Sequence, residues 1–326
     1  MATVHALEDG LRRRGARERG GVSLPSCRMR WGSLGAEFAA AIASICFGAS
    51  VVATRYAVSQ IEPVSLAFLR YVIAVACLSP MARSLVRRSI PRRDILAIGA
   101  LGAMFFGVFP WSFSAALTYI PSSRVAIELA TMPLLTLLVS RIRGYDQLTP
   151  RTLLGQLLAF VGLVFALRSP GPSHAVVPNA WIGDALVAVT AGCGAIYNVF
   201  SRPYLQRYSP MPVTAMSMVA GVAFLAPFAA SHGVVSAAAA LSRSAWLAVL
   251  FLGAIGGALG FFLWIWALTH ASPSRVAVFF PLNPITAIAL SALLLHEPVT
   301  RQFLVGLCAV LGGIVLANLR TPPRHA

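Results

Sequence analysis

Apolar residues occur in long segments of about 20 residues, separated by short gaps that hold arginine, proline and glycine. A helix of about 20 apolar residues crosses the roughly 30 Å hydrocarbon layer of a bilayer. The pattern therefore predicts an all-α integral membrane protein with ten transmembrane helices. The predicted spans are residues 36–57, 63–82, 94–118, 121–140, 150–168, 180–202, 211–231, 245–268, 273–294 and 301–319.

One part of the chain is a copy of another. The run from Ala116 to Ala126 recurs, with substitutions, from Ala267 to Ala277, an offset of 151 positions that continues without a gap through the last predicted helix. Such self-similarity indicates a duplicated unit. We therefore predict two five-helix repeats, residues 36–168 and 180–319. Because five is an odd number, the two repeats must be inverted relative to each other.

Composition supports a membrane protein. The 326 residues are 58% apolar and 11% charged, whereas soluble domains have about 25% charged residues. A net charge of +16 could suggest a nucleic-acid partner, but the arginines lie in short gaps between apolar segments, as cytoplasmic loops require. We therefore expect the lipid bilayer and a small-molecule substrate as partners, and no nucleic acid.

Arginine is distributed unevenly between the two sides that this topology defines. Seven arginines precede the first span, five lie in 83–93 and eight lie in other gaps on the same side, against four on the opposite side. Cytoplasmic loops carry the excess of basic residues. We therefore place both termini in the cytoplasm and the protein in the cytoplasmic (inner) membrane.

The two ends of the chain are predicted to be tails on the cytoplasmic side. Residues 1–35 are expected to be disordered, and residues 320–326 form a short second tail. The first tail contains no apolar run of roughly 7–15 residues, which a signal peptide requires. Met29 is an alternative start of the chain.

Several short motifs occur between residues 37 and 319. They are Phe47 to Ser50, Pro63, Ala67 to Tyr71, Ala115 to Leu117, Pro133, Ala267, Leu268, Pro284 and His296 to Pro298, with Asp146 as a variant of the last motif in the first repeat. With these motifs the chain resembles the drug/metabolite transporter superfamily, EamA type. The resemblance implies a secondary transporter or exporter of small metabolites, with inverted repeats around a central cavity.

Two charged residues are predicted to lie well inside the bilayer. Arg70 is seven residues past Pro63, and Glu128 is seven residues past Pro121, so both should lie about 10 Å below the same membrane face. Charges at membrane depth are costly and usually functional. We expect Arg70 and Glu128 to face inward and either to pair or to contact substrate. A purely structural ion pair is the alternative.

Other polar and aromatic residues within the spans are candidates for the transport pathway. The tryptophans could equally be interfacial anchors, and the asparagine at the end of its span could simply bond a backbone carbonyl. Glycine and alanine at four-residue spacing indicate internal helix packing, or alternatively a homodimer face. The pathway candidates beside the two charges are Tyr71, Trp111, Tyr197, Asn198, Trp264 and Asn283.

Prolines occur at matching positions in the two repeats. Pro133 and Pro284 are predicted to lie within spans, and Pro281 adds a third. A proline inside a helix removes a backbone donor and frees the carbonyl four residues earlier. We consider these prolines hinge candidates, with a kink satisfied by a neighbouring helix as the alternative.

Three functions are compatible with a multi-spanning chain. We favour a transporter or exporter that moves an amino-acid-like or other amphipathic or anionic metabolite by alternating access. An integral-membrane enzyme would need clustered catalytic or metal-ligating residues, and the six histidines and five cysteines are scattered, so we predict no enzyme activity, metal or cofactor. A non-transporting scaffold remains the third hypothesis.

Overall fold

The computed structural model describes residues 26–82, 90–129, 131–144, 150–167, 179–208, 210–270, 279, 282–296 and 299–318. Every regular element within these ranges is a helix. The first repeat contains α2 (Ser26–Ala57), α3 (Pro63–Ala82), α4 (Arg92–Ala103), η1 (Met104–Val108), α5 (Phe109–Tyr119), α6 (Ser122–Leu129), α7 (Met132–Ile142) and α8 (Pro150–Leu167). The second contains α9 (Ala180–Phe200), α10 (Arg202–Tyr208), α11 (Pro210–Ser231), α12 (Val234–Ala240), α13 (Arg243–Leu250), η3 (Phe251–Leu259), α14 (Gly260–His270), α16 (Leu282–Leu294) and α17 (Arg301–Asn318).

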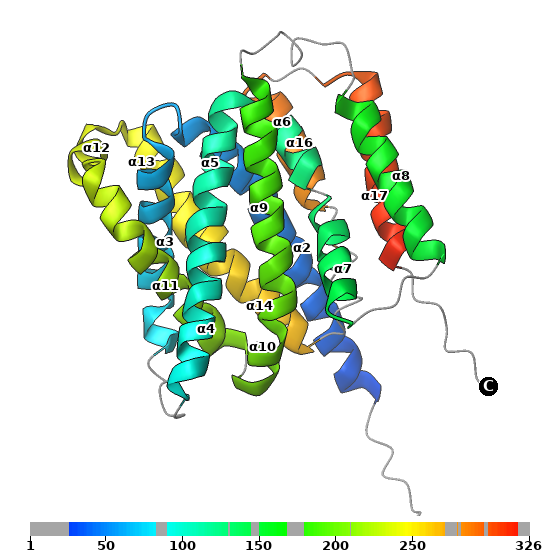
Figure 1. Cartoon of the computed structure of the whole chain (residues 1–326), viewed down its shortest axis with the longest axis horizontal. Helices are drawn as coiled ribbons and strands as arrows, with labels where there is room; N and C mark the ends of the chain where they lie inside the picture. Colours follow the sequence, from blue (N-terminus) through cyan, green and yellow to red (C-terminus); the bar gives the residue numbers. More distant parts are fainter. Residues whose placement is uncertain are drawn as a thin grey trace, which may run out of the picture.

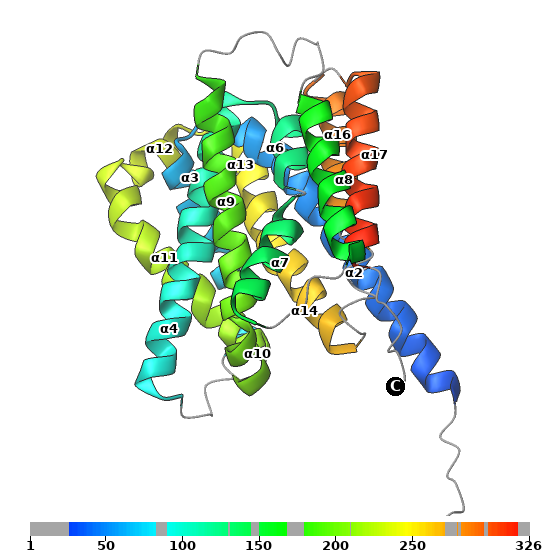
Figure 2. The same ribbon diagram turned by 45° about the vertical axis from the view of Figure 1, so that its right-hand side comes forward.

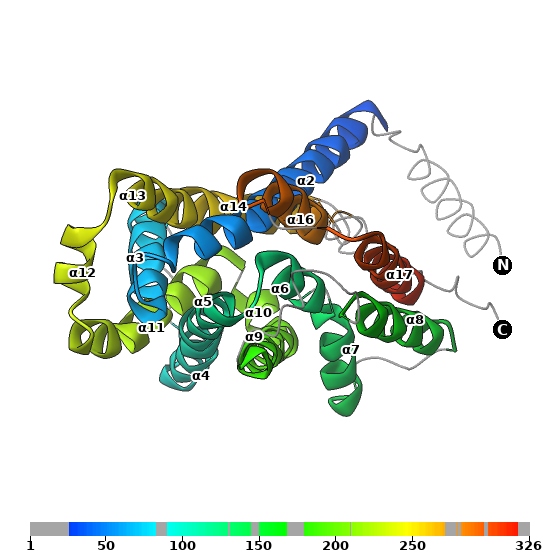
Figure 3. The same cartoon turned by 90° about the horizontal axis from the view of Figure 1, so that it is seen from above.

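The helices form one bundle whose long members run between two ends (Figure 1). In this view α2 rises from the lower end, whereas α9 descends from the upper end to α10 and α11 rises again to α12. Figures 2 and 3 show α8 and α17 side by side at one edge of the bundle, with α12 at the opposite edge. Corresponding first helices of the two repeats thus run in opposite directions.

Among the described residues, five helical stretches are long and apolar enough to cross a membrane: Gly35–Ala57, Arg92–Tyr119, Ala180–Phe200, Pro210–Ser231 and Arg243–Leu268. Shorter apolar helices cover Pro63–Ser79, Leu157–Ala166, Leu282–Leu294 and Arg301–Gly313. Large apolar side chains such as Phe38, Leu96 and Leu293 are exposed on the outside of the bundle. An apolar surface of this kind suits contact with lipid.

Helix packing is reciprocal between the two repeats. The first helix of the first repeat, α2, packs against α14 and α16, and the first helix of the second repeat, α9, packs against α5 and α7. In the same way α3 packs against η3, whereas α11 packs against α4 and η1. The fifth helices, α8 and α17, pack against each other. Each repeat therefore buries its apolar faces largely against the other repeat.

Glycines allow this close approach. A methyl group on Gly253 would lie 2.5 Å from the Ile73 side chain in α3, and one on Gly107 would lie 2.6 Å from Phe224 in α11. In the α8–α17 pair, a methyl group on Gly162 would lie 2.8 Å from the Gly306 carbonyl oxygen. Small residues let helices approach closely where apolar burial alone gives little drive. The interpretation of these glycines as internal packing residues is confirmed.

Some predicted helix boundaries are wrong. The first helix begins at Ser26 rather than near residue 36, so residues 26–35 are helical. The span predicted at 121–140 is divided into α6 and α7, with Thr131 in a turn between them. The disorder predicted for residues 1–25 and the beginning of the span predicted at 273–294 lie outside the described residues, apart from Phe279.

The prolines that were expected inside helices lie at helix beginnings. Pro133 is the second residue of α7, and Pro284 is the third residue of α16. Proline is tolerated in the first turn because the backbone N–H groups there have no intrahelical acceptor. The mid-helix position is therefore wrong, whereas the hinge role stays a prediction. Pro281 lies outside the described residues.

A π-helical segment interrupts the third predicted span of each repeat. These are η1 and η3, and with the offset of 151 positions Met104 and Val108 of η1 align with Ile255 and Leu259 of η3. π-helical turns are rare and occur frequently at functional sites. No periodicity in the apolar sequence had indicated them.

Candidate functional site

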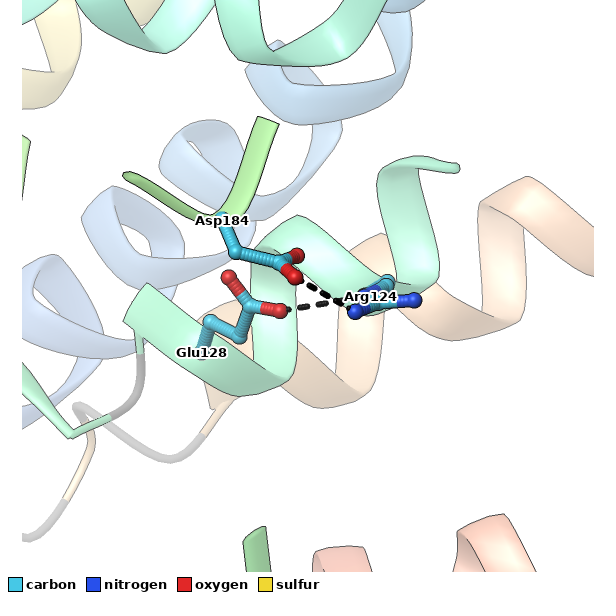
Figure 4. Close-up of polar contacts among 3 residues, drawn as sticks. All are labelled: Arg124, Glu128 and Asp184. Carbon is cyan, nitrogen blue, oxygen red and sulfur yellow. Dashed lines mark hydrogen bonds and ion pairs between the residues drawn. The ribbon is translucent and has the colours of Figure 1, made fainter. Parts of the chain in front are cut away.

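Three charged side chains meet between α6 and α9 and are called the ion cluster below (Figure 4). The guanidinium of Arg124 donates from Nε to Oε1 of Glu128 at 3.2 Å and from Nη2 to Oδ2 of Asp184 at 2.7 Å. The exposed fractions of the side chains are 17% for Arg124, 9% for Glu128 and 36% for Asp184. Residues of both repeats therefore share one charged contact that is largely removed from solvent.

Local helix geometry brings the ion cluster together. Arg124 and Glu128 are four residues apart in α6, so they lie on the same face of the helix. Asp184 is the fifth residue of α9, close to the end where that helix begins. Next to it Gly183 packs against Tyr119 and Ile120 at the end of α5, which allows α9 to approach α5 and α6 closely.

Arg70 and Glu128 were expected either to pair with each other or to contact substrate, and the structure shows that they do not pair with each other. Glu128 pairs with Arg124, and no carboxylate among the described residues pairs with Arg70. Neither Arg124 nor Asp184 is among the site residues that the sequence predicted. Two signals were present in the sequence: Arg124 precedes Glu128 by four residues, and Asp184 is the sole charged residue between Ala180 and Phe200.

Arg70 of α3 lies within the bundle without an ion partner in the described part of the chain. Its Nε atom is buried and has no hydrogen-bond partner there, and its Cζ atom lies 5.3 Å from the centroid of the Tyr71 ring. On its other side are Ser50 of α2 and Gly256 of η3; a methyl group on Gly256 would lie 3.8 Å from Nη2 of Arg70. A cation with unused donors in such a place is suited to bind an anionic group.

Aromatic rings from both repeats surround this part of α3 and are called the aromatic cluster below. Phe105 of η1 stacks on Tyr197 of α9 with ring centroids 4.2 Å apart. Phe106, also in η1, lies edge-on to Tyr71 at 5.3 Å and to Phe261 at 5.3 Å. Such pairs each contribute about 0.5–1.5 kcal/mol beyond area burial. The members are Phe47, Tyr71, Phe105, Phe106, Tyr197 and Phe261.

Three of the predicted pathway residues thus lie in or beside the aromatic cluster, and Tyr71 also contacts Arg70. Tyr71 and Tyr197 belong to the aromatic cluster, and Trp264 lies at its edge, 6.3 Å from the Phe47 ring. Sequence reasoning missed the four phenylalanines, because phenylalanine in an apolar span carries no distinguishing signal.

The remaining candidates lie elsewhere. Trp111 is exposed on α5, as expected of a lipid-facing anchor. Asn198 is exposed and donates to Thr136 of α7 at 3.4 Å. The backbone of Asn283 packs closely on Gly48 of α2. No group of three metal-ligating residues occurs in the part of the chain that the structure describes.

A second polar contact joins the repeats at the other end of the bundle. Asp94, in the first turn of α4, accepts hydrogen bonds from Tyr208 and, at 3.2 Å, from Arg207, both in α10. The hydrogen bond to Asp94 raises the pKa of Tyr208, because it favours the neutral phenol. The ion cluster and this contact therefore lie at opposite ends, between the same two repeats (Figure 1).

The apolar exterior, the spanning helices and the charged groups enclosed among them define a multi-pass membrane protein. The sequence profile of the EamA-like transporter family matches residues 34–168 and again residues 181–319. The chain belongs to the EamA-like transporter family, which confirms the resemblance drawn from its motifs and supports a role as a transporter.

Curated relatives agree with this class. An "Uncharacterized transporter" of Archaeoglobus fulgidus is 28% identical over 83% of this chain and 94% of its own. A "Probable terminal-alkyne amino-acid exporter" of Streptantibioticus cattleyicolor is 24% identical over 89% and 95%. A "Probable amino-acid metabolite efflux pump" of Salmonella typhimurium is 23% identical over 86% and 93%. A protein of known crystal structure has the same fold, with a TM-score of 0.62 at 20% identity over 86% of this chain and 96% of that one.

Proposed function

We propose that this transporter exports a small amphipathic carboxylate, amino-acid-like in size and charge, across the cytoplasmic membrane. The observation that carries the proposal is Arg70 beside the aromatic cluster: its Nε atom is buried without a hydrogen-bond partner among the described residues, and no carboxylate there pairs with it. A guanidinium binds a carboxylate by charge-assisted hydrogen bonds, and aromatic rings accept an apolar body. Two relatives carry names of amino-acid exporters, which agrees with this substrate class.

The proposed mechanism is alternating access between two inverted five-helix repeats, ten spans in all. Opposite chain directions of α2 and α9 and the reciprocal packing of the repeats support the inversion. Arg70 comes from the first repeat, and the aromatic cluster includes Tyr197 and Phe261 from the second. Movement of one repeat against the other would therefore change access to a site at their contact.

The test uses purified protein in liposomes that are preloaded with unlabelled L-phenylalanine, and follows exchange of external radiolabelled L-phenylalanine. Two competitors separate the groups of the substrate: 3-phenylpropanoate retains the carboxylate and lacks the amine, and phenethylamine retains the amine and lacks the carboxylate. We expect 3-phenylpropanoate to inhibit and phenethylamine to have little effect, because Arg70 recognises the anion.

Arg70→Gln should lower exchange roughly 10- to 100-fold, since a hydrogen bond to a charged group contributes about 1.5–3 kcal/mol. The thermal stability of this variant should remain, because the change removes a charge that no carboxylate among the described residues pairs with. Arg243→Gln, an exposed arginine at the start of α13, is the matched control and should keep wild-type exchange. Exchange no faster than in protein-free liposomes, or inhibition by phenethylamine alone, would contradict the proposal.

A further inference from the structure

The ion cluster holds one carboxyl group more than its single guanidinium can neutralise. With Glu128 and Asp184 both ionised, the cluster has a net charge of −1, although the Glu128 side chain is about nine-tenths buried. Moreover, Oδ1 of Asp184 is buried and has no hydrogen-bond partner among the described residues. Figure 4 shows the two carboxyl groups facing each other on one side of Arg124. An acceptor without a donor and an unbalanced charge thus occur at the same place.

We propose that Glu128 and Asp184 share one exchangeable proton, and that binding and release of this proton are coupled to transport. The inference rests on the transport function proposed above. A proton on either carboxyl group makes the cluster neutral and turns that group into a donor for its neighbour. Without the proton, two carboxylates on α6 and α9 repel each other and share a single guanidinium. Proton occupancy therefore determines how firmly α6 of the first repeat contacts α9 of the second.

A proton fits this site better than a metal cation does. The guanidinium of Arg124 already occupies the side of the carboxylates where a second cation would bind, at 3.2 Å from Glu128 and 2.7 Å from Asp184. A sodium ion there would meet like charge at short range, whereas a proton joins a carboxyl group and needs no coordination shell.

Few other ionisable side chains of the described residues lie near the ion cluster, so Glu128, Asp184 and Arg124 determine its protonation. The charged groups that act on Glu128 are Asp184 and Arg124. On the helices packed against α6, Arg55 of α2 donates instead to the Leu117 carbonyl, and Tyr119 of α5 lies against α9. Helix α16 has no titratable side chain, and α8 has a single charged residue, Arg151, in its first turn.

The second repeat does not reproduce the cluster. With the offset of 151, Arg124 aligns with Arg275, but Glu128 aligns with Phe279. The first helices align through Gly48 and Gly194, which places Phe38 opposite Asp184. Duplication of the scaffold therefore yields one site with two carboxyl groups and a second without any. One proton per transport cycle is the expected stoichiometry.

Two measurements on the full-length protein test the inference. The first follows radiolabelled L-phenylalanine in proteoliposomes, both as exchange without a gradient and as accumulation driven by a pH gradient. We expect Glu128→Gln and Asp184→Asn to lower the ratio of driven to exchange flux at least roughly tenfold, a typical size for coupling between sites. Glu62→Gln is the matched control, because Glu62 is an exposed carboxylate that pairs with His232 outside the cluster.

The second measurement needs no substrate. Infrared difference spectra of the reconstituted wild-type protein should show loss of a protonated carboxyl band as the pH rises from about 5 to about 9. Glu128→Gln or Asp184→Asn should alter this band, and Glu62→Gln should leave it unchanged. Exchange that proceeds without any response to the pH gradient would overturn the inference while the transport function stands. Accumulation driven by a sodium gradient instead would overturn it in favour of a metal cation. If L-phenylalanine is not exchanged at all, the infrared measurement still tests the inference. Wild-type spectra that show no pH-dependent protonated carboxyl band would overturn it.

Discussion

At the scale of single residues, Gly256 determines how much room is left beside Arg70. A methyl group on Gly256 would collide with the hydroxyl of Ser50 and approach Nη2 of Arg70 to 3.8 Å. The Ser50 hydroxyl donates to the Cys46 carbonyl at 2.8 Å, so it does not move aside freely. The absence of a side chain at Gly256 therefore allows α2 and η3 to pack closely next to Arg70.

Gly256→Ala should reduce the exchange of radiolabelled L-phenylalanine about tenfold, because the collision of the methyl group with the Ser50 hydroxyl shifts α2 and η3 apart next to Arg70. The double variant Gly256→Ala with Ser50→Ala should recover most of the exchange, since the colliding hydroxyl is gone. Gly192→Ala is the control, as a methyl group at Gly192 meets nothing within 4 Å. Equal loss in the single and the double variant would contradict a steric effect at this place.

The sequence identified the charged residues of the site more readily than their partners. Arg70 and Glu128 stand out because charges are rare within apolar spans. Their depth was predicted, but depth leaves the rotation of each helix about its axis open, and rotation decides which side chains meet. Glu128 consequently turned out to face Arg124 and Asp184. The phenylalanines of the aromatic cluster gave no signal, because a pathway ring and a packing ring look the same in sequence.

At the scale of helices, the α8–α17 pair depends on backbone contacts between small residues. A methyl group on Gly313 would lie 2.5 Å from the Gly155 carbonyl oxygen, whereas one on the preceding Gly312 would meet nothing within 4 Å. The two glycines are neighbours in one helix, so they share helix propensity and differ in what they face. Their comparison isolates the packing of the two fifth helices.

Gly313→Ala should lower the free energy of unfolding of the purified protein by about 1–3 kcal/mol, because α8 and α17 must separate to accept the methyl group. Gly312→Ala should be neutral or stabilising by up to about 1 kcal/mol, since alanine favours the helix. Thermal unfolding in the same detergent measures both. Equal stabilities of the two variants would show that the pair is not held by this contact.

Apolar segment length predicted where the long apolar helices lie, and five of them among the described residues are long enough to cross a membrane. It could not predict the division between α6 and α7 or the π-helical segments η1 and η3. Both depend on backbone hydrogen bonds, and apolar side chains do not reveal which carbonyl a backbone N–H group selects. The prolines gave a hint, since Pro133 lies where the new helix α7 begins.

At the scale of the whole molecule, the ion cluster and the Asp94 contact, two of the polar contacts between the repeats, lie at opposite ends of the bundle. The ion cluster joins α6 to α9 at one end, and Asp94 joins α4 to α10 at the other. Alternating access requires that contacts at one end loosen while those at the other hold. The repeat offset predicted two equivalent units, but neither contact could be inferred from it. The positions that correspond to these carboxylates in the second repeat hold uncharged residues: Glu128 aligns with Phe279, and Asp94 aligns with Ala245.

The orientation in the membrane is the last prediction. The beginnings of α2 and α4 and all of α10 lie at one end of the bundle, and α12 with the beginnings of α6 and α9 lies at the other (Figure 1). The first end includes the arginine-rich segments, so it should face the cytoplasm. A green fluorescent protein fusion after residue 326 should then fluoresce, and an alkaline phosphatase fusion there should be inactive. A phosphatase fusion placed between α8 and α9 should be active, because an odd number of spans separates that loop from either terminus. Activity of phosphatase at the C-terminus would contradict both this orientation and an inverted pair of five-helix repeats with a cytoplasmic N-terminus.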